Sequence, residues 1–201
     1  MMHDQIHLAS QSPRRRQLLD QLGVRCELLL PADDEDAEAL EAVLPAELPA
    51  DYVQRVTALK LDAARRRQHQ RGLPRWPILC ADTTVALARR ILGKPADAAE
   101  ATEMLRALSG HTHRVLTAVA LWTGEEQLAG LCISHVRVAA LSDDVIARYV
   151  ASGEPFGKAG AYAIQGPFAG WIEHVVGSHS GIMGLPLYET AKLLRQAHCR
   201  F

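Results

Sequence analysis

Short apolar runs of strand length alternate along the chain with segments that have the periodicity of a packed helix, and this alternation constrains the fold most. The expected strands lie at residues 6–9, 26–30, 77–81, 85–92, 115–121, 131–139 and 171–176. The expected helices run over residues 12–22, 51–70, 97–108, 143–150 and 186–194. Because strands and helices interleave, the sequence predicts an α/β protein with a mixed, strongly twisted sheet.

Residues 31–50 are acidic and contain three prolines, so we interpret them as a loop. Asp51 is then expected to cap the long second helix, whose residues Val53 and Val56 face inward. The apolar run 77–81 stops at Asp82, which predicts that this carboxylate follows the end of a strand.

Composition limits the possible partners. The chain has 201 residues, 48% hydrophobic, which is enough for one domain over residues 1–201 with a substantial core. A formal net charge of -1 argues against duplex nucleic acid and anionic membranes as partners. No apolar run approaches the roughly 20 residues that span a bilayer. The four cysteines are scattered and the chain lacks the layout of a secretory signal, so we expect a cytoplasmic protein.

The segment Ser10-Gln11-Ser12-Pro13-Arg14-Arg15 links an expected strand to a helix start. Unpaired N–H groups and the helix dipole favour an anion there. Two arginines in the first turn oppose the same dipole, and a bound phosphate would resolve that conflict. The alternative is a pair of solvated arginines beside an ordinary helix cap.

Asp82 is a second candidate for a chemical role. The carboxyl end of a strand is where open α/β sheets bind ligands, and an ionised carboxylate there could hold Mg²⁺ or take a proton from water. The alternative is an aspartate that simply begins a turn.

Lys60 is the main physical anomaly, because it shares the inward stripe of its helix with Val56 and Ala64. An unpaired buried ammonium is costly, so Lys60 should either reach an anion or extend to solvent at the edge of the stripe.

Three weaker candidates lie in loops. Lys94 is on the turn Gly93-Lys94-Pro95, Gln165 is in a segment of small residues, and Glu35 is in the acidic loop. Glu35 could be a ligand of a hard cation, or the loop could carry only solvated charge.

Taken in order, several motifs resemble those of the Maf family of nucleotide pyrophosphatases. The resemblance runs from about residue 6 to residue 194. It rests on Leu8-Ala9-Ser10-Gln11-Ser12-Pro13-Arg14-Arg15, Ala81-Asp82-Thr83, Gly93-Lys94-Pro95, Leu108-Ser109-Gly110-His111-Thr112-His113, Tyr149-Val150-Ala151-Ser152-Gly153-Glu154-Pro155, Lys158-Ala159-Gly160-Ala161-Tyr162, Ile164-Gln165-Gly166 and Gly184-Leu185-Pro186-Leu187.

The resemblance implies a fold like that of inosine triphosphate pyrophosphatases, with two lobes around a central cleft, and often a homodimer. It also implies cleavage of a nucleoside triphosphate to the monophosphate and pyrophosphate, with a divalent metal cation, Mg²⁺ or Mn²⁺. Water would attack the α-phosphorus in line while positioned charges stabilise the leaving group.

The resemblance also implies roles for individual residues. Asp82 matches the proton acceptor, and it would share the metal with Glu35, although neighbouring acidic residues make that second ligand ambiguous. Lys60 and Lys94 match lysines of the catalytic centre that bind phosphate. The remaining substrate-binding residues would be Ser10, Arg14, Arg15, Thr83 and Gln165.

Arg14, Thr83 and Gln165 resemble the members that act on dTTP and UTP, and modified pyrimidine nucleotides are further candidates. Two alternatives remain open at this point. One is a preference for another nucleotide such as 7-methyl-GTP. The other is a nucleotide-binding regulator of cell division without turnover.

Overall fold

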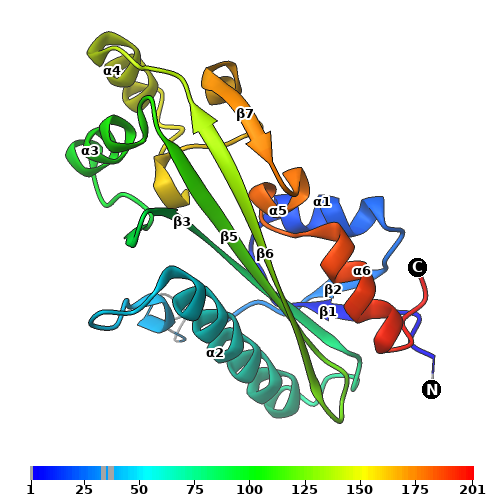
Figure 1. The fold of residues 1–201 in the computed structure, drawn as a ribbon. Coiled ribbons are helices and arrows are strands. Elements are labelled where there is room, and N and C mark those ends of the chain that lie inside the picture. Colours follow the sequence, from blue (N-terminus) through cyan, green and yellow to red (C-terminus); the bar gives the residue numbers. More distant parts are fainter. Residues whose placement is uncertain (1, 33–34, 36–38) are drawn as a thin grey trace.

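The computed structural model describes residues 2–32, 35 and 39–201, and its strands form one seven-stranded mixed sheet (Figure 1). The strand order is β2-β1-β3-β5-β6-β7, with β4 paired to β3. The strands are β1 (Ile6–Leu8), β2 (Cys26–Leu28), β3 (Ile78–Leu87), β4 (Arg90–Leu92), β5 (Thr112–Trp122), β6 (Gln127–Val138) and β7 (Ile172–Val176). The first three of the path are parallel and the others antiparallel, so the predicted mixed sheet is confirmed.

Helices cover both faces of the sheet. In Figure 1, α2 lies along one face, α1, α5 and α6 gather near the chain termini, and α3 and α4 lie at the far end of β5 and β6. The α-helices are α1 (Pro13–Gln21), α2 (Pro49–Gln70), α3 (Ala98–Leu108), α4 (Asp143–Ala151), α5 (His179–Met183) and α6 (Leu187–Gln196). The 3₁₀ helices are η1 (Ala39–Glu41), η2 (Ala159–Ala161) and η3 (Pro167–Trp171). Across the described ranges, no helix is both long and apolar enough to cross a bilayer.

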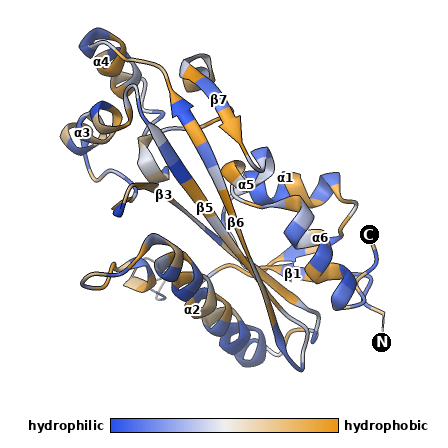
Figure 2. Ribbon diagram, in the orientation of Figure 1, coloured by the Kyte–Doolittle hydropathy of each residue, from blue (hydrophilic) through white to orange (hydrophobic). Residues whose placement is uncertain are grey.

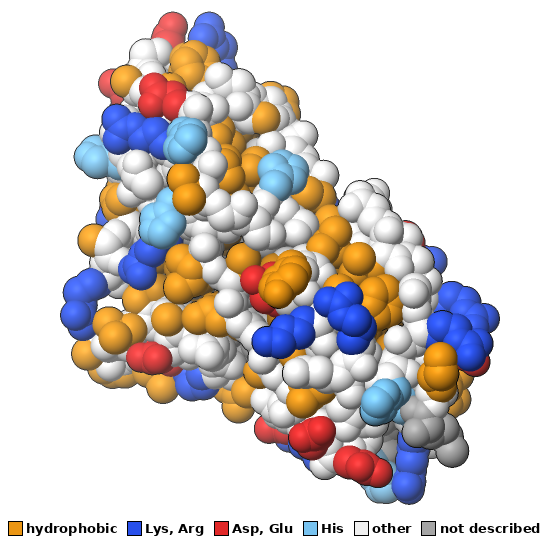
Figure 3. All heavy atoms as spheres, turned by 45° about the vertical axis from the view of Figure 1, so that its right-hand side comes forward, with side chains coloured by type: hydrophobic (Ala, Val, Ile, Leu, Met, Phe, Trp, Pro, Cys, Tyr) orange, Lys and Arg blue, Asp and Glu red, His pale blue; other side chains and the backbone are white. Residues whose placement is uncertain are grey.

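The buried apolar side chains of the described residues form four groups, two toward the ends of the sheet and two between α2 and the sheet. One group lies under α3 and α4 and includes Leu105 and Phe168, and another joins β1, α1 and α6 through Leu8 and Leu194. Figure 2 shows hydrophobic stretches along the sheet, while many outward positions of α2 and α6 are hydrophilic. On the face drawn in Figure 3, acidic, basic and hydrophobic side chains are interspersed, in keeping with the small net charge. The sheet therefore connects two lobes, as expected.

The second helix begins earlier than the sequence indicated. Leu48 is its N-cap and Pro49 its first residue, so Asp51 lies inside the first turn and the expected Asp51 cap is wrong. Proline suits this position because its fixed φ is helical and the first turn needs no N–H bond. The segment interpreted as a loop also contains η1.

The expectation that β3 ends at Asp82 is likewise wrong. β3 continues to Leu87, and Asp82 lies in its middle, paired with Ala118 of β5. The ladder with β5 overrides the turn preference of aspartate. On the opposite edge, β1 pairs only with Ile78 and Leu79, and β4 begins pairing at Val85. Residues 80–84 thus have no partner strand on that edge within the described part of the chain, and Asp82 lies in this gap.

Gly160 holds the segment after α4 against the sheet, and this contact yields a stability prediction. Its N–H donates to the carbonyl of Gly93 at 3.0 Å, and its φ is +70°. A Cβ at this position would lie 2.8 Å from Val85 Cγ1, whereas a Cβ at Gly157, with φ +71°, would meet nothing within 4 Å.

We therefore expect Gly160→Ala to lower the free energy of unfolding more than Gly157→Ala. Both variants have the cost of a left-handed backbone, about 1–3 kcal/mol, and Gly160→Ala adds overpacking of about 1–3 kcal/mol. Urea unfolding of the two variants measures the difference. Equal losses would contradict the close packing of Gly160 on Val85.

Candidate active site

A cleft of about 510 Å³ lies along the gap in the edge of β3. Its walls come from the start of α1, from α2, from the turn after β4 and from residues 156–165. Eight of the site residues named from the sequence line it: Ser10, Arg14, Arg15, Lys60, Asp82, Thr83, Lys94 and Gln165. Glu35 is absent from this lining among the described residues.

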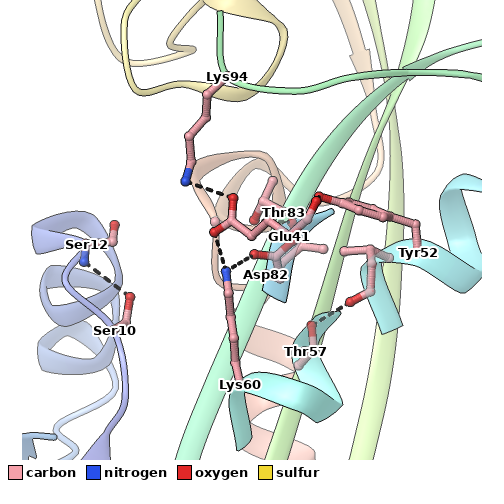
Figure 4. A network of polar contacts seen from close by, with 12 residues as sticks. Ser10, Ser12, Glu41, Tyr52, Thr57, Lys60, Asp82, Thr83 and Lys94 are labelled. Carbon is pink, nitrogen blue, oxygen red and sulfur yellow. Dashed lines mark hydrogen bonds and ion pairs between the residues drawn. The ribbon is translucent and has the colours of Figure 1, made fainter. Parts of the chain in front are cut away.

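Lys60 lies at the centre of the polar network in the cleft (Figure 4). Its Nζ is 2.6 Å from Asp82 Oδ1 and 2.7 Å from Glu41 Oε1. Burial lowers the pKa of Lys60, but the two carboxylates raise it by more, so the net pKa lies above its ordinary value. The lysine of the inward stripe therefore reaches anions and remains an ammonium.

Glu41 connects α2 with the turn after β4 across the cleft. Its second oxygen, Oε2, is 2.9 Å from the Nζ of Lys94, and Figure 4 shows Lys94 and Lys60 approaching it from opposite sides. The hydroxyl of Tyr52 donates to the Glu41 carbonyl at 3.0 Å and fixes the turn of η1. Burial raises the pKa of Glu41, and the ammonium groups of Lys60 and Lys94 lower it by more, so the group stays ionised.

Glu41 was not predicted from the sequence. It lies in the same acidic segment as Glu35, and no local pattern distinguishes one carboxylate there from another. Only the fold places Glu41 beside Asp82.

Glu35 has a different partner. Its carboxylate accepts hydrogen bonds from Arg67 Nε at 2.9 Å and Nη2 at 2.8 Å, and from the N–H of Ala32 at 3.1 Å. Arg67 is buried and also donates to the carbonyl of Leu29 at 2.8 Å. The hydrogen bonds from Arg67 lower the pKa of Glu35. The structure thus joins Glu35 to Arg67 and does not bring it to Asp82.

Arg15 ties three elements together behind the cleft. It donates to the Gly184 carbonyl at 2.8 Å, to Ser10 Oγ at 3.1 Å and to Thr83 Oγ1 at 3.3 Å. Burial lowers the pKa of its guanidinium, and the charge of Asp82 opposes that effect. The alternative of a solvated arginine is therefore wrong for Arg15, which connects α1, β3 and the end of α5. Arg14 is half-buried and lines the cleft.

The wall formed by residues 156–165 has one charged lining residue, Lys158, whose ammonium group donates to the Glu154 carbonyl. Gln165 is exposed there, near the apolar lining residues Phe156 and Ile164 and the aromatic ring of Tyr162. The hydroxyl of Tyr162 is 2.8 Å from Nε2 of buried His113, whose pKa burial lowers to about 4. This half of the cleft suits a neutral, flat group.

The carboxylates of the cleft have the chemistry of a hard-cation site. Asp82 and Glu41 direct oxygens to the same point, the Nζ of Lys60. Within the described residues, no three His, Cys, Asp or Glu side chains cluster as metal ligands. Two carboxylates suffice for Mg²⁺, which usually keeps several waters and binds substrate phosphates.

Comparison with known proteins identifies the family of the chain. The model of the family described as Maf-like protein matches residues 5–197. A dTTP/UTP pyrophosphatase of Albidiferax ferrireducens is 65% identical over 194 residues, which are 96% of this chain and 97% of the relative. Another, from Cupriavidus pinatubonensis, is 62% identical over 200 residues and covers 100% of both chains. The resemblance in the sequence motifs is thereby confirmed, and the chain belongs to the Maf family.

Proposed function

We propose that this chain hydrolyses dTTP and UTP to the nucleoside monophosphate and pyrophosphate. The observation that carries the proposal is the meeting of Lys60, Lys94 and Asp82 in one cleft, with two arginines on the wall formed by the start of α1. The similar proteins named dTTP/UTP pyrophosphatase support the choice of nucleotide.

The cationic side chains fit a triphosphate. Lys60 and Lys94 already bridge one carboxylate from opposite walls, so the same ammonium groups can contact successive phosphates. Arg14 and Arg15 add guanidinium groups at the start of α1, where unpaired N–H groups also favour anions. This local cluster lets a chain with a net charge of -1 bind a polyanion.

Asp82 is the proposed general base. Its Oδ1 is held by Lys60 at 2.6 Å, while Oδ2 has no hydrogen-bond partner among the described residues. A carboxylate fixed by one oxygen can orient a water with the other and take its proton as the water attacks the α-phosphorus. Such general-base catalysis contributes typically about 10²–10⁴-fold.

A divalent cation, Mg²⁺ or Mn²⁺, is the proposed cofactor, and Asp82 is the proposed first ligand. When bound, the cation supplies positive charge at the phosphate oxygens. The family resemblance assigns the second ligand to Glu35, whereas the geometry favours Glu41, because Glu41 faces Asp82 and Glu35 pairs with Arg67.

The nucleoside is proposed to bind beyond Thr83, toward Gln165. An amide side chain can both donate to and accept from the edge of a pyrimidine base. Phe156 and Ile164 supply apolar surface for the ring. A homodimer and a cytoplasmic location stay predictions.

Asp82→Asn should lower kcat for pyrophosphate release from dTTP by about 10²–10⁴-fold, because the amide cannot take the proton. Asp62→Asn is the matched control, since Asp62 lies on α2 and pairs with Arg65 outside the cleft. We expect normal turnover for the control and folded protein in both cases by circular dichroism. Near-normal turnover of Asp82→Asn would remove Asp82 from its proposed role.

The two candidate metal ligands can be distinguished, because replacing each should have a different effect on the Mn²⁺ dependence of activity. Glu41→Gln should raise the Mn²⁺ concentration needed for half-maximal activity, because one charged ligand is lost. Glu35→Gln should leave that concentration unchanged but lower the melting temperature, since it weakens the pairing of buried Arg67, an effect of roughly 1–3 kcal/mol. Titration of both variants with Mn²⁺ decides the assignment, and the reverse pattern would transfer the role to Glu35.

A further inference from the structure

Behind the cleft, a short chain of hydroxyl groups gives Thr83 a fixed polarity. Thr117 lies opposite Thr83 in the register of β5 with β3, and the two Oγ1 atoms are 2.9 Å apart. Thr117 is 1% exposed and, among the described residues, does not line the cleft. Thr117 nevertheless contacts Thr83, which lines the cleft.

The direction of each hydrogen bond follows from the acceptor at the end of this chain, the carbonyl of Gly181. Thr117 Oγ1 is 2.7 Å from the carbonyl of Gly181, and a carbonyl can only accept. The single hydroxyl proton of Thr117 is therefore used, and Thr83 must donate its own proton to Thr117. Because Thr83 also accepts from Arg15, it presents one remaining lone pair and no proton.

Ser10 has the opposite polarity. Its Oγ accepts from the N–H of Ser12 at 3.2 Å and from Arg15 Nη1 at 3.1 Å. Both lone pairs are engaged, and its proton has no acceptor among the described residues. The cleft thus offers a hydroxyl donor at Ser10, suited to a phosphate oxygen, and a hydroxyl acceptor at Thr83.

We propose that Thr117 is a positioning residue that keeps the Thr83 hydroxyl as an acceptor, so that Thr83 binds an N–H or O–H donor of the nucleoside. Phosphate oxygens at neutral pH are acceptors, and two acceptors repel. In dTTP the available donors are the imide N3–H of the base and the 3′-hydroxyl of the sugar. The inference rests on the proposed function and adds the polarity of its recognition.

The experiment removes one donor of the substrate at a time. We would measure kcat/KM for dTTP, N3-methyl-dTTP and 3′-deoxy-dTTP with the wild type, Thr117→Ser and Thr117→Val. For one of the two analogues, kcat/KM should be roughly 5- to 150-fold lower than for dTTP with the wild type and with Thr117→Ser. This is the range expected when a buried group is left unpaired. With Thr117→Val the difference in kcat/KM should shrink to about 2-fold. The Thr83 hydroxyl is then free to turn its proton toward the cleft, so the donor of dTTP no longer meets a fixed acceptor.

The two analogues separate the base from the sugar as the source of the donor. Thr83→Val, which removes the acceptor itself, should abolish the same loss and serves if Thr117→Val does not fold. Thr190→Val is the matched control, because Thr190 is buried outside the cleft lining and its hydroxyl has no partner in the described part of the chain. It should leave the loss at its wild-type size.

Two results would overturn the inference. One is equal kcat/KM for dTTP and both analogues with the wild type. The other is an undiminished loss with Thr117→Val. A wild type that releases no pyrophosphate from dTTP would instead overturn the proposed function.

Discussion

The ammonium of Lys60, held between the carboxylates of Asp82 and Glu41, is the interaction on which the rest of the site depends. An unpaired charge on the inward face of a long helix would be strongly destabilising. The two ion pairs remove that cost, and in doing so they fix α2 against β3 and draw the turn of η1 over the cleft. Through Glu41 they also reach Lys94 on the other wall. The contacts that offset the cost of burying the Lys60 ammonium therefore also place the charged groups around the cleft.

The edge gap of β3 provides that space. β1 leaves β3 after Leu79 and β4 joins at Val85, so neither strand covers the residues between them. Side chains on both faces of β3 can then contribute to one cleft: Asp82 toward α2, and Thr83 toward Arg15. Hydroxyl groups on the Thr83 side have a fixed polarity, which complements the charges on the Asp82 side.

Much of this could be predicted from the sequence where local chemistry decides the structure. The helix expected at residues 97–108 forms as α3, and Asp97 is its N-cap, with Oδ1 2.8 Å from the backbone nitrogen of Glu100. The periodicity of α2 placed Lys60 on the inward stripe, where it had to reach either an anion or solvent, and the ordered motifs identified the family. The end of β3 was misplaced because the ladder to β5 from Asp82 onward depends on residues 28 to 36 positions away. Glu41 was missed for the same reason, since only tertiary contacts distinguish it from other acids of its segment. No pattern in the sequence around Thr117 indicated that its hydroxyl would contact Thr83.

The central claim is that Lys60, Lys94 and Asp82 act together on one triphosphate. A crystal structure with Mn²⁺ and a dTTP analogue that has a non-hydrolysable α,β-bridge tests it most directly. The account predicts phosphate oxygens in contact with both lysines, and the α-phosphorus facing Oδ2 of Asp82. An analogue bound outside the cleft, or bound while Lys60 and Lys94 touch no phosphate, would contradict it.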